Sequence, residues 1–316
     1  MRFNTLVVVG LLAISQSALA LTVGFSQGPS KSNWDTALRE EVSAEAQKRG
    51  IDLKFTDGQR NHADQIRAVR GMLAQGVDAI IIDPVQADGW DVVLLEVRRT
   101  RIPVILLNGG ISADPLLYRV RIGANFEEEG KKVGKWLMDK IRGKCNIVEL
   151  QGTALAMATI DRAKGFRDAV GGLYGGNISR SLSADFTQAK GHEVMADFLR
   201  SEDPTRICAL FSHSDEMALG AIEAIKEAGL KPGKDILVVS VGGIPEYFKA
   251  MAHGEANITV ERAHHLGAQA YDMVEKILAG EVLGTGKFIS TTGDVFGQDT
   301  AAAEYDRRSK QSGHEP

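Results

Sequence analysis

The stretch DGQRNHADQIRAVRGMLAQGVDAIIIDPV, residues 57–85, decides the fold class of this 316-residue chain. Within it, residues 63–75 predict a helix, and the apolar run at 79–82 predicts a strand that follows almost at once. The strand is a continuous apolar run and not an alternation of apolar and polar residues. Such runs are typical of a parallel sheet that helices cover on both faces. The stretch therefore predicts one unit of an α/β protein.

The same unit repeats on both sides of this stretch. In the first part of the chain we expect strands at 21–26, 51–55, 104–107 and 118–122 and helices at 33–49 and 88–100. The pattern restarts after Asn125, with helices at 127–141, 161–170, 187–200, 215–228 and 263–279 and strands at 146–150, 178–182, 208–211, 236–240 and 258–260. Two sets of strand–helix units in tandem predict two doubly wound, Rossmann-like lobes with a ligand cleft between them.

The first 20 residues match a secretory signal peptide. Arg2 supplies a basic start, residues 6–14 form an apolar stretch, and Ala18-Leu19-Ala20 is a small-x-small cleavage site. The apolar run is too short for a membrane span of roughly 20 residues; an uncleaved anchor and a buried strand are the alternatives. We therefore expect residues 1–20 to be removed and the mature protein to be exported.

Composition and motifs argue against several classes of function. Apolar residues make up 44% of the chain, and the formal net charge of −4 gives no support for nucleic-acid or membrane-surface binding. The string GFSQG at 24–28 matches the nucleophile elbow of hydrolases, but residues 29–32 separate Ser26 from the following helix. His264 and His265 are adjacent and so point in different directions on a helix, unlike zinc ligands spaced by four. We therefore expect no catalytic residue, no metal site and no cofactor.

The chain has two cysteines, Cys145 and Cys208, each at the start of an apolar run that predicts a strand. In an oxidising compartment the two can pair, because the starts of neighbouring parallel strands lie close enough for a bridge. Two buried free thiols are the alternative that these residues leave open.

Several long segments together resemble the sugar-binding proteins of bacterial ABC transporters. Besides 57–85, they are LTVGFSQ (21–27), NIVELQGT (146–153), IDRAKGFRDA (160–169), DFTQAKGHEVM (185–195) and SDEMALGAIEAIKEAGLKPGKDI (214–236). The resemblance runs from about Leu21 to about Lys287. It implies the type I periplasmic binding protein fold, a periplasmic location, and one sugar or sugar-like ligand that is held between the lobes and delivered to a membrane permease. It also implies a disulfide between Cys145 and Cys208.

The resemblance and the restart after Asn125 together predict the domains. We expect lobe 1 at 21–124 and 258–287, lobe 2 at 125–257 and 288–303, and a flexible, polar tail at 304–316. A three-stranded hinge would cross near Asn125, Asn257 and Lys287, and the helix at 263–279 would pack on lobe 1. We expect a monomer. Docking onto a membrane receptor as a sensor is the alternative to a permease, and an exported hydrolase is a third possibility.

The resemblance also implies a ligand site. The positions that match the ligand residues of the family are Lys31, Ser32, Asn33, Trp34, Asp35, Asn108, Gly109, Arg162, Ser214 and Gly242. Trp34 can stack on the apolar face of a sugar or pack in the core. Arg162 can fork hydrogen bonds to the ligand or pair with Asp161 or Asp185. Ser214 can contact the ligand, cap the helix that follows, or do both.

Some of these positions depart from the galactofuranose-binding members of the family. The charges at Lys31 and Asp35 are reversed. Asn108 and Gly109 replace an Asp-Arg pair, and Gly242 replaces an aspartate. We therefore expect a roomier and slightly more positive site, suited to a larger sugar or to one that bears a carboxylate or phosphate. Galactofuranose would then not be the best ligand.

Overall fold

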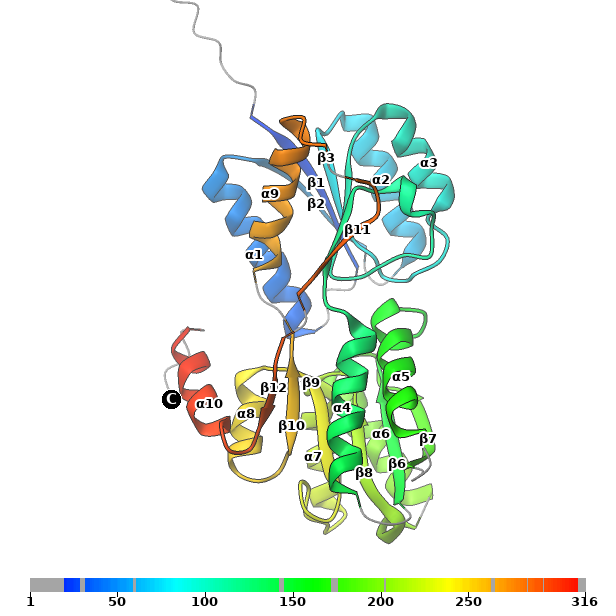
Figure 1. Cartoon of the computed structure of the whole chain (residues 1–316), viewed down its shortest axis with the longest axis vertical. Helices are drawn as coiled ribbons and strands as arrows, with labels where there is room; N and C mark the ends of the chain where they lie inside the picture. Colours follow the sequence, from blue (N-terminus) through cyan, green and yellow to red (C-terminus); the bar gives the residue numbers. More distant parts are fainter. Residues whose placement is uncertain are drawn as a thin grey trace, which may run out of the picture.

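The computed structural model describes residues 20–28, 32–58, 61–141, 145–171, 176–201, 203–262, 265–282, 284–291 and 293–311. Most of the predicted signal peptide, the candidate ligand residue Lys31 and the end of the tail at 312–316 lie outside the described residues. The described chain folds into two α/β lobes, one above the other in Figure 1, and each is built on its own sheet. The predicted fold class is confirmed.

Lobe 1 contains a six-stranded parallel sheet in the order β11-β5-β4-β3-β1-β2. Its elements are β1 (Thr22–Gln27), α1 (Asn33–Arg49), β2 (Asp52–Asp57), α2 (His62–Gln75), β3 (Ala79–Asp83), α3 (Asp91–Thr100), β4 (Val104–Leu107), the 3-10 helix η1 (Pro115–Leu117), β5 (Val120–Gly123), α9 (Leu266–Leu278) and β11 (Lys287–Ser290). Helix α9 packs against α1, as predicted.

Lobe 2 contains a second six-stranded sheet in the order β12-β10-β9-β8-β6-β7, in which β12 runs antiparallel to β10. Its elements are α4 (Phe126–Lys140), β6 (Cys145–Gln151), α5 (Met157–Val170), β7 (Gly176–Ser183), α6 (Gln188–Ser201), the 3-10 helix η2 (Pro204–Arg206), β8 (Ile207–Ser212), α7 (Asp215–Glu227), β9 (Leu237–Gly242), α8 (Pro245–Ala252), β10 (Ile258–Glu261), β12 (Val295–Gly297) and α10 (Ala301–Gln311).

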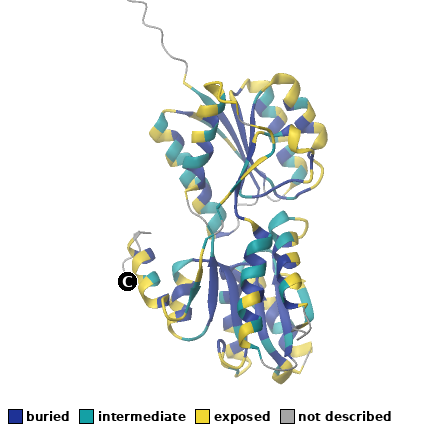
Figure 2. Ribbon diagram, in the orientation of Figure 1, coloured by how far each residue is buried: buried dark blue, intermediate teal, exposed yellow. Residues whose placement is uncertain are grey.

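The continuous apolar strands are buried on both faces, as Figure 2 shows for the centre of each lobe. Strand β3 is the clearest case, since all five of its residues are buried. Ile81 packs in the core cluster that includes Tyr271 of α9, whereas Ile80 and Ile82 pack in the opposite cluster around Trp90. Successive residues of the strand thus pack against the helical layers on opposite faces of the sheet, which confirms the prediction made from 57–85.

The hinge differs from the prediction at two of its three crossings. The first follows β5, and Asn125 caps α4 by accepting a hydrogen bond from the Glu128 N–H at 3.1 Å. The second follows β10, because β10 pairs with β9 and therefore belongs to lobe 2 and not to lobe 1. The third follows β11, whose residues 288–290 pair with β5 and so belong to lobe 1. Strand length and hydrophobicity do not reveal which of two sheets a short strand joins.

The predicted flexible tail at 304–316 is wrong for its described part. Residues 301–311 form helix α10, which packs against α8. Arg308 is buried, donates to the Gly243 carbonyl oxygen at 3.0 Å, and forms an ion pair with Glu261 at 2.6 Å. Its guanidinium also lies 4.7 Å from the ring centroid of Phe248. The helix is attached to lobe 2 through the contacts of an arginine. Its polar composition therefore did not predict a packed helix.

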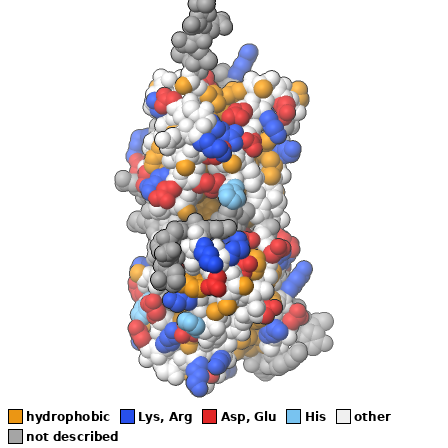
Figure 3. All heavy atoms as spheres, turned by 90° about the vertical axis from the view of Figure 1, so that its left-hand side faces the viewer, with side chains coloured by type: hydrophobic (Ala, Val, Ile, Leu, Met, Phe, Trp, Pro, Cys, Tyr) orange, Lys and Arg blue, Asp and Glu red, His pale blue; other side chains and the backbone are white. Residues whose placement is uncertain are grey.

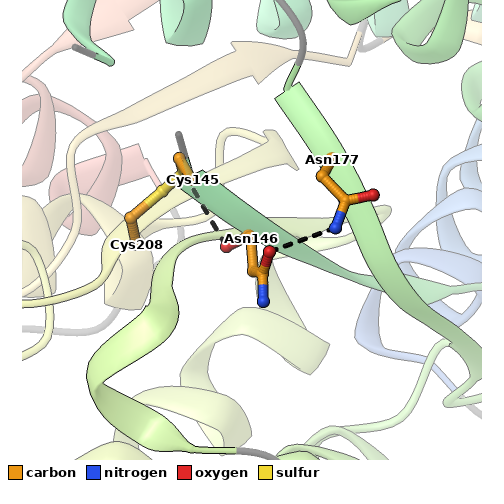
Figure 4. Close-up of a disulfide and its surroundings, with 4 residues drawn as sticks. All are labelled: Cys145, Asn146, Asn177 and Cys208. Carbon is orange, nitrogen blue, oxygen red and sulfur yellow. Dashed lines mark hydrogen bonds between the residues drawn. A yellow bond between two sulfur atoms is a disulfide. The ribbon is translucent and has the colours of Figure 1, made fainter. Parts of the chain in front are cut away.

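Cys145 and Cys208 form a disulfide, as the resemblance implied (Figure 4). Cys145 is the first residue of β6 and Cys208 the second residue of β8, two neighbouring parallel strands, and their Cα atoms lie 5.6 Å apart. Beside the bridge, Asn177 donates to the Asn146 side chain at 3.1 Å, which links β7 to β6. Among the described residues no helix is long and apolar enough to cross a membrane.

Candidate functional site

A cavity lies between the two lobes, at the carboxyl ends of the strands. It is lined by Ser32, Asp35, Asp83, Pro84, Val85, Asn108, Gly109, Thr153, Ala156, Met157, Ala158, Arg162, Phe186, Ser214, Glu216 and Arg262. About 670 Å³ of space, counted out to the open mouth, is free of protein atoms. This is the position at which doubly wound sheets bind ligands, and the lining joins strand ends from both lobes.

In lobe 1 the cavity wall is built on the ends of β3 and β4. Asn108 adopts a left-handed backbone, with φ of +59°, and its side-chain amide donates to the Asp83 carboxylate at 3.2 Å. Asp83 is buried, and burial together with the nearby charge of Asp35 raises the pKa of this carboxyl to about 7. Sequence reasoning missed Asp83, although it directly follows the apolar run that identified β3.

Asp35 combines a structural and a site role at the start of α1. Its backbone N–H donates to the Ser32 hydroxyl at 3.1 Å, and its carboxylate accepts from the Ser32 N–H at 3.3 Å, which completes a capping box. Both residues also line the cavity. Burial raises the pKa of Asp35, although the bond from Ser32 and the charge of Arg262 partly oppose the shift. The family arginine that Asp35 replaces could not cap the helix in this way.

In lobe 2 the main polar group is Arg162, whose side chain is fully buried on α5. Its Nε donates to Glu129 at 2.8 Å and its Nη1 donates to the His213 carbonyl oxygen at 3.0 Å. Its ion-pair partner is therefore Glu129 and not Asp161 or Asp185. Nη2 is buried and has no partner among the described residues, so it is the donor that remains for a ligand.

The aromatic ring that lines the cavity is Phe186 and not Trp34. Asp185 and Phe186 both adopt left-handed backbones, with φ of +57° and +55°. Thr153 donates to the Asp185 carboxylate at 2.7 Å, which fixes this loop. The Phe186 ring lies on Gly152, where a β-carbon would overlap it. Phe186 lies in the quoted segment DFTQAKGHEVM, but two consecutive left-handed residues cannot be predicted from that pattern.

Trp34 is covered by Arg262, a second residue that sequence reasoning missed. The Arg262 guanidinium carbon lies 3.6 Å from the Trp34 ring centroid, and its Nη2 donates to the Asn108 side-chain oxygen at 2.9 Å. Burial, reinforced by the positive charge of Arg162, lowers the pKa of Arg262 to about 10. Arg262 follows β10 directly, so the signal for it was its place at a strand end.

The structure brings together six of the ten predicted ligand residues: Ser32, Asp35, Asn108, Gly109, Arg162 and Ser214. The described lining does not include Asn33, Trp34 or Gly242, and Lys31 lies outside the described residues. Ser214 lines the cavity, and its hydroxyl accepts from the Met217 N–H at 3.3 Å as the N-cap of α7, so its capping role is confirmed and its contact with a ligand stays a prediction. Asn33 is exposed in the first turn of α1.

The expected gain in room at the two glycines is not found. A β-carbon at Gly109 would lie 2.9 Å from Pro84, and one at Gly242 would lie 2.5 Å from the Asp215 carboxylate. Asp215 is itself fixed, because it accepts hydrogen bonds from the backbone of Gly243 and from Thr259. Neighbouring groups thus fill the space that the absent side chains leave.

Among the described residues the lining shows no excess of cationic side chains, and Lys31, which the expected charge included, lies outside them. The ionisable groups of the lining are three carboxyls, Asp35, Asp83 and Glu216, and two guanidiniums, Arg162 and Arg262. Sequence reasoning counted only positions that matched ligand residues, and so missed Asp83, Glu216 and Arg262. Among the described residues no group of histidine, cysteine and carboxylate side chains could hold a metal ion.

Comparison with known proteins places this arrangement among known binding proteins. The model of the periplasmic binding protein domain matches residues 23–282. The chain is 45% identical over 313 residues to the galactofuranose-binding protein YtfQ of Escherichia coli K12, and the match covers 97% of this chain and 98% of that protein. It is 28% identical over 270 residues to the ribose import binding protein of Salmonella typhimurium, covering 85% and 87% of the two chains.

Two solved structures are similar over nearly their whole length. The binding component of the arabinose ABC transporter of Shewanella sp. ANA-3, bound to α- and β-L-arabinofuranose, is 54% identical with a TM-score of 0.88, and the match covers 92% of this chain and 97% of that one. A Mycobacterium smegmatis protein in complex with β-D-fucofuranose is 38% identical with a TM-score of 0.87, covering 92% and 96%. The chain belongs to the periplasmic binding protein family.

Proposed function

We propose that this protein is the solute-binding component of an ABC importer and that it binds a neutral sugar in its furanose form between the two lobes. The observation that carries the proposal is the interlobe cavity itself. It offers a free guanidinium donor from Arg162, carboxyl acceptors from lobe 1 and an aromatic ring from Phe186. Two relatives, 54% and 38% identical to this chain, hold furanoses in their solved structures.

The lining suits the surface of a sugar. The carboxyls of Asp35, Asp83 and Glu216 can accept hydrogen bonds from ligand hydroxyls, while the guanidiniums can donate to hydroxyl and ring oxygens. The apolar face of the ring can lie against Phe186. The lining thus presents carboxyl acceptors as well as guanidinium donors, which matches a neutral sugar, because each of its hydroxyls can both donate and accept. A neutral sugar fits better than the acidic or phosphorylated ligand expected from the sequence.

Closure of the lobes on the ligand is the proposed mechanism, and it makes and breaks no covalent bond. The relatives named above are binding proteins by name, which supports a non-enzymatic role. We propose that the signal peptide is cleaved after Ala20 and that the protein acts as a periplasmic monomer that meets a membrane permease. The face drawn in Figure 3 mixes acidic and basic side chains, unlike the single-sign surface that nucleic-acid binding needs.

The test is a ligand panel on the mature chain, residues 21–316, unfolded and refolded to remove any sugar carried from the host. The free sugars are L-arabinose, D-galactose, D-fucose and D-ribose, each of which supplies some furanose at equilibrium. Methyl β-D-galactopyranoside, which cannot become a furanose, and D-galacturonate are the controls. A sugar at 100 times its Kd should raise the free energy of unfolding by about 2.7 kcal/mol.

We expect at least one free sugar to shift the thermal midpoint and to bind in calorimetry, and the pyranoside not to bind. Tighter binding of galacturonate than of every neutral sugar would overturn the proposal that the ligand is neutral. Binding of the pyranoside as tight as that of the free sugars would overturn the proposal that the ligand is bound as a furanose. No response to any sugar would remove the proposed function as a whole.

A further inference from the structure

The orientation of Arg162 depends on a main-chain group. Its Nη1 donates to the carbonyl oxygen of His213 at 3.0 Å, and its Nε donates to Glu129 at 2.8 Å. These two bonds fix the plane of the guanidinium, and the plane determines the direction of the unpartnered Nη2 of this cavity-lining residue. Whatever holds His213 in place therefore also sets the position of the ligand donor.

The side chain of His213 is held by Glu149, inside the core of lobe 2. The His213 Nε2 and a Glu149 carboxylate oxygen lie 3.0 Å apart, and both side chains have no exposed surface. Burial lowers the pKa of His213, although Glu149 partly opposes the shift. The imidazole is therefore neutral near pH 7 and donates its Nε2 proton to the carboxylate.

Glu149 is in turn held from the far side of β6. Its carboxylate accepts from Ser181 at 2.5 Å and from Arg167 at 2.7 Å. Burial alone would raise the pKa of Glu149, but the hydrogen bonds from His213 and Ser181 and the charge of Arg167 outweigh burial and lower it. Arg167 is 45% exposed, so a continuous chain of polar contacts runs from the cavity to the outer surface of lobe 2.

A buried acid and imidazole pair is weak evidence of a role in the stability of this core. Removing two polar groups from water is expensive, and a packed apolar pair of similar volume often stabilises a core as well or better. The pair lies beside an apolar cluster, one member of which, Phe211, has its ring centroid 4.8 Å from that of His213. The polar pair also lies at a sensitive point, because His213 immediately precedes Ser214, which lines the cavity and caps α7.

We propose that Glu149 and His213 are positioning residues of the ligand site, which fix the His213 carbonyl oxygen and through it aim Arg162 Nη2 at the ligand. They do not touch the ligand themselves. The inference rests on the proposed function, since it concerns the affinity of the same cavity. Glu149 and His213 do not line the cavity, but His213 lies next to Arg162 and Ser214, which do.

A double-mutant cycle tests it on the mature protein, with L-arabinose and D-galactose as probes. Glu149→Gln should weaken binding by about tenfold in the wild-type background, a coupling typical of residues in one hydrogen-bonded network. In the Arg162→Ala background the same change should alter the Kd less than about twofold, because the group that it positions is absent. A general disturbance of the fold would weaken binding equally in both backgrounds.

Arg167→Ala is a second, milder variant, because it removes the outer partner of Glu149 from a partly exposed position. Its matched control is Arg180→Ala, which breaks a partly exposed ion pair with Asp197 in the same lobe. Arg167→Ala should weaken binding several-fold and Arg180→Ala should not. If Glu149→Gln fails to fold, the proposal is tested by comparing Arg167→Ala with Arg180→Ala. A double-mutant cycle of Arg167→Ala with Arg162→Ala then replaces the first cycle.

Two results would overturn the inference: additive effects in the cycle, or an unchanged Kd in Glu149→Gln and Arg167→Ala. Failure of the wild-type protein to bind either probe, or any other sugar of the panel, would instead count against the proposed function. The two failures are thus distinguished by the wild-type measurement alone.

Discussion

Arg262 lies over the ring of Trp34, with its guanidinium carbon 3.6 Å from the ring centroid. Trp34 belongs to α1 in lobe 1, whereas Arg262 directly follows β10 in lobe 2, so this contact crosses the hinge region. The same guanidinium donates to Asn108 of lobe 1 at 2.9 Å. The tryptophan face that the sequence offered to a sugar is thus occupied by a protein cation, and Arg262 ties the two lobes together beside the cavity.

The first prediction is that Arg262→Ala lowers sugar affinity by about 1–3 kcal/mol, because it removes a hydrogen bond to Asn108, a cation–π contact and a cavity donor. Arg262→Lys should restore little of the lost affinity, since an ammonium group has no plane that can stack on Trp34 while it donates to Asn108. Trp34→Ala should weaken binding only where Arg262 is present. Calorimetry on the three variants and on the double variant checks this. Equal effects of Trp34→Ala with and without Arg262 would show that Trp34 contacts the sugar directly.

The second prediction concerns Asp83 and pH. Burial raises the pKa of this carboxyl from 3.8 to about 7, so between these values the folded protein binds more protons at this site than the unfolded chain does. Its contribution to stability is therefore fully present below about pH 4 and is lost as the pH rises through 7. The loss is at most about 1.4 kcal/mol for each pH unit in that window.

Asp83→Asn should remove this part of the pH dependence, because the amide cannot ionise. Chemical denaturation of the ligand-free protein between pH 5 and pH 8 measures it, and the exposed Asp88→Asn serves as the control. The wild-type protein and the Asp88 variant should lose more stability over this range than the Asp83 variant does. Parallel curves for all three proteins would contradict the assignment.

The third prediction concerns the disulfide. The exported protein should show no free thiol under denaturant without reductant, because the structure pairs Cys145 with Cys208. The bridge closes a separation of 63 residues, so reduction should cost about 4 kcal/mol in the chain-entropy description. The bridge lies at the starts of β6 and β8, whereas the cavity lies at strand ends. Sugar affinity of the reduced but folded protein should therefore stay within about twofold of the oxidised form.

The architecture could be predicted because it depends on local periodicity. The run at 79–82 is apolar on both faces, and its Ile80 and Ile81 pack on opposite helical layers, as such a run requires. The lobe to which β10 belongs could not be predicted in this way. Both sheets offer a parallel apolar edge, and only tertiary pairing with β9 decides the choice.

The places of six site residues could be predicted from the resemblance, whether or not the residue type is kept. Arg162 and Ser32 keep the family residue, Asp35 and Asn108 do not, and all four line the cavity. Gly109 seemed to create room, but Pro84 from the preceding strand end fills it. Phe186 depends on two consecutive left-handed residues, which are costly for non-glycine residues and are stabilised by contacts distant in the sequence.

The last prediction concerns Leu155, which bridges the lobes from the loop before α5. Its backbone is left-handed, with φ of +65°, and its carbonyl oxygen accepts from the Ala87 N–H of lobe 1 at 3.1 Å. A leucine in this conformation costs about 1 kcal/mol or more, whereas glycine adopts it freely. The structure carries this cost while the contact between the lobes is formed, and we expect an open form, in which that contact is broken, to release it.

Leu155→Gly should therefore favour the closed form and tighten sugar binding by about threefold to tenfold. The control is Arg101→Gly, which relieves a similar φ of +64° at the end of α3, where the Arg101 N–H donates to Arg98 of the same lobe. Both variants should relieve the local backbone strain, but only Leu155→Gly should change the Kd. It should do so through a slower dissociation rate. Stopped-flow fluorescence and calorimetry on both variants measure this. If Leu155→Gly binds as the wild type does, the strain is present in the open form as well and the contact with Ala87 does not control closure.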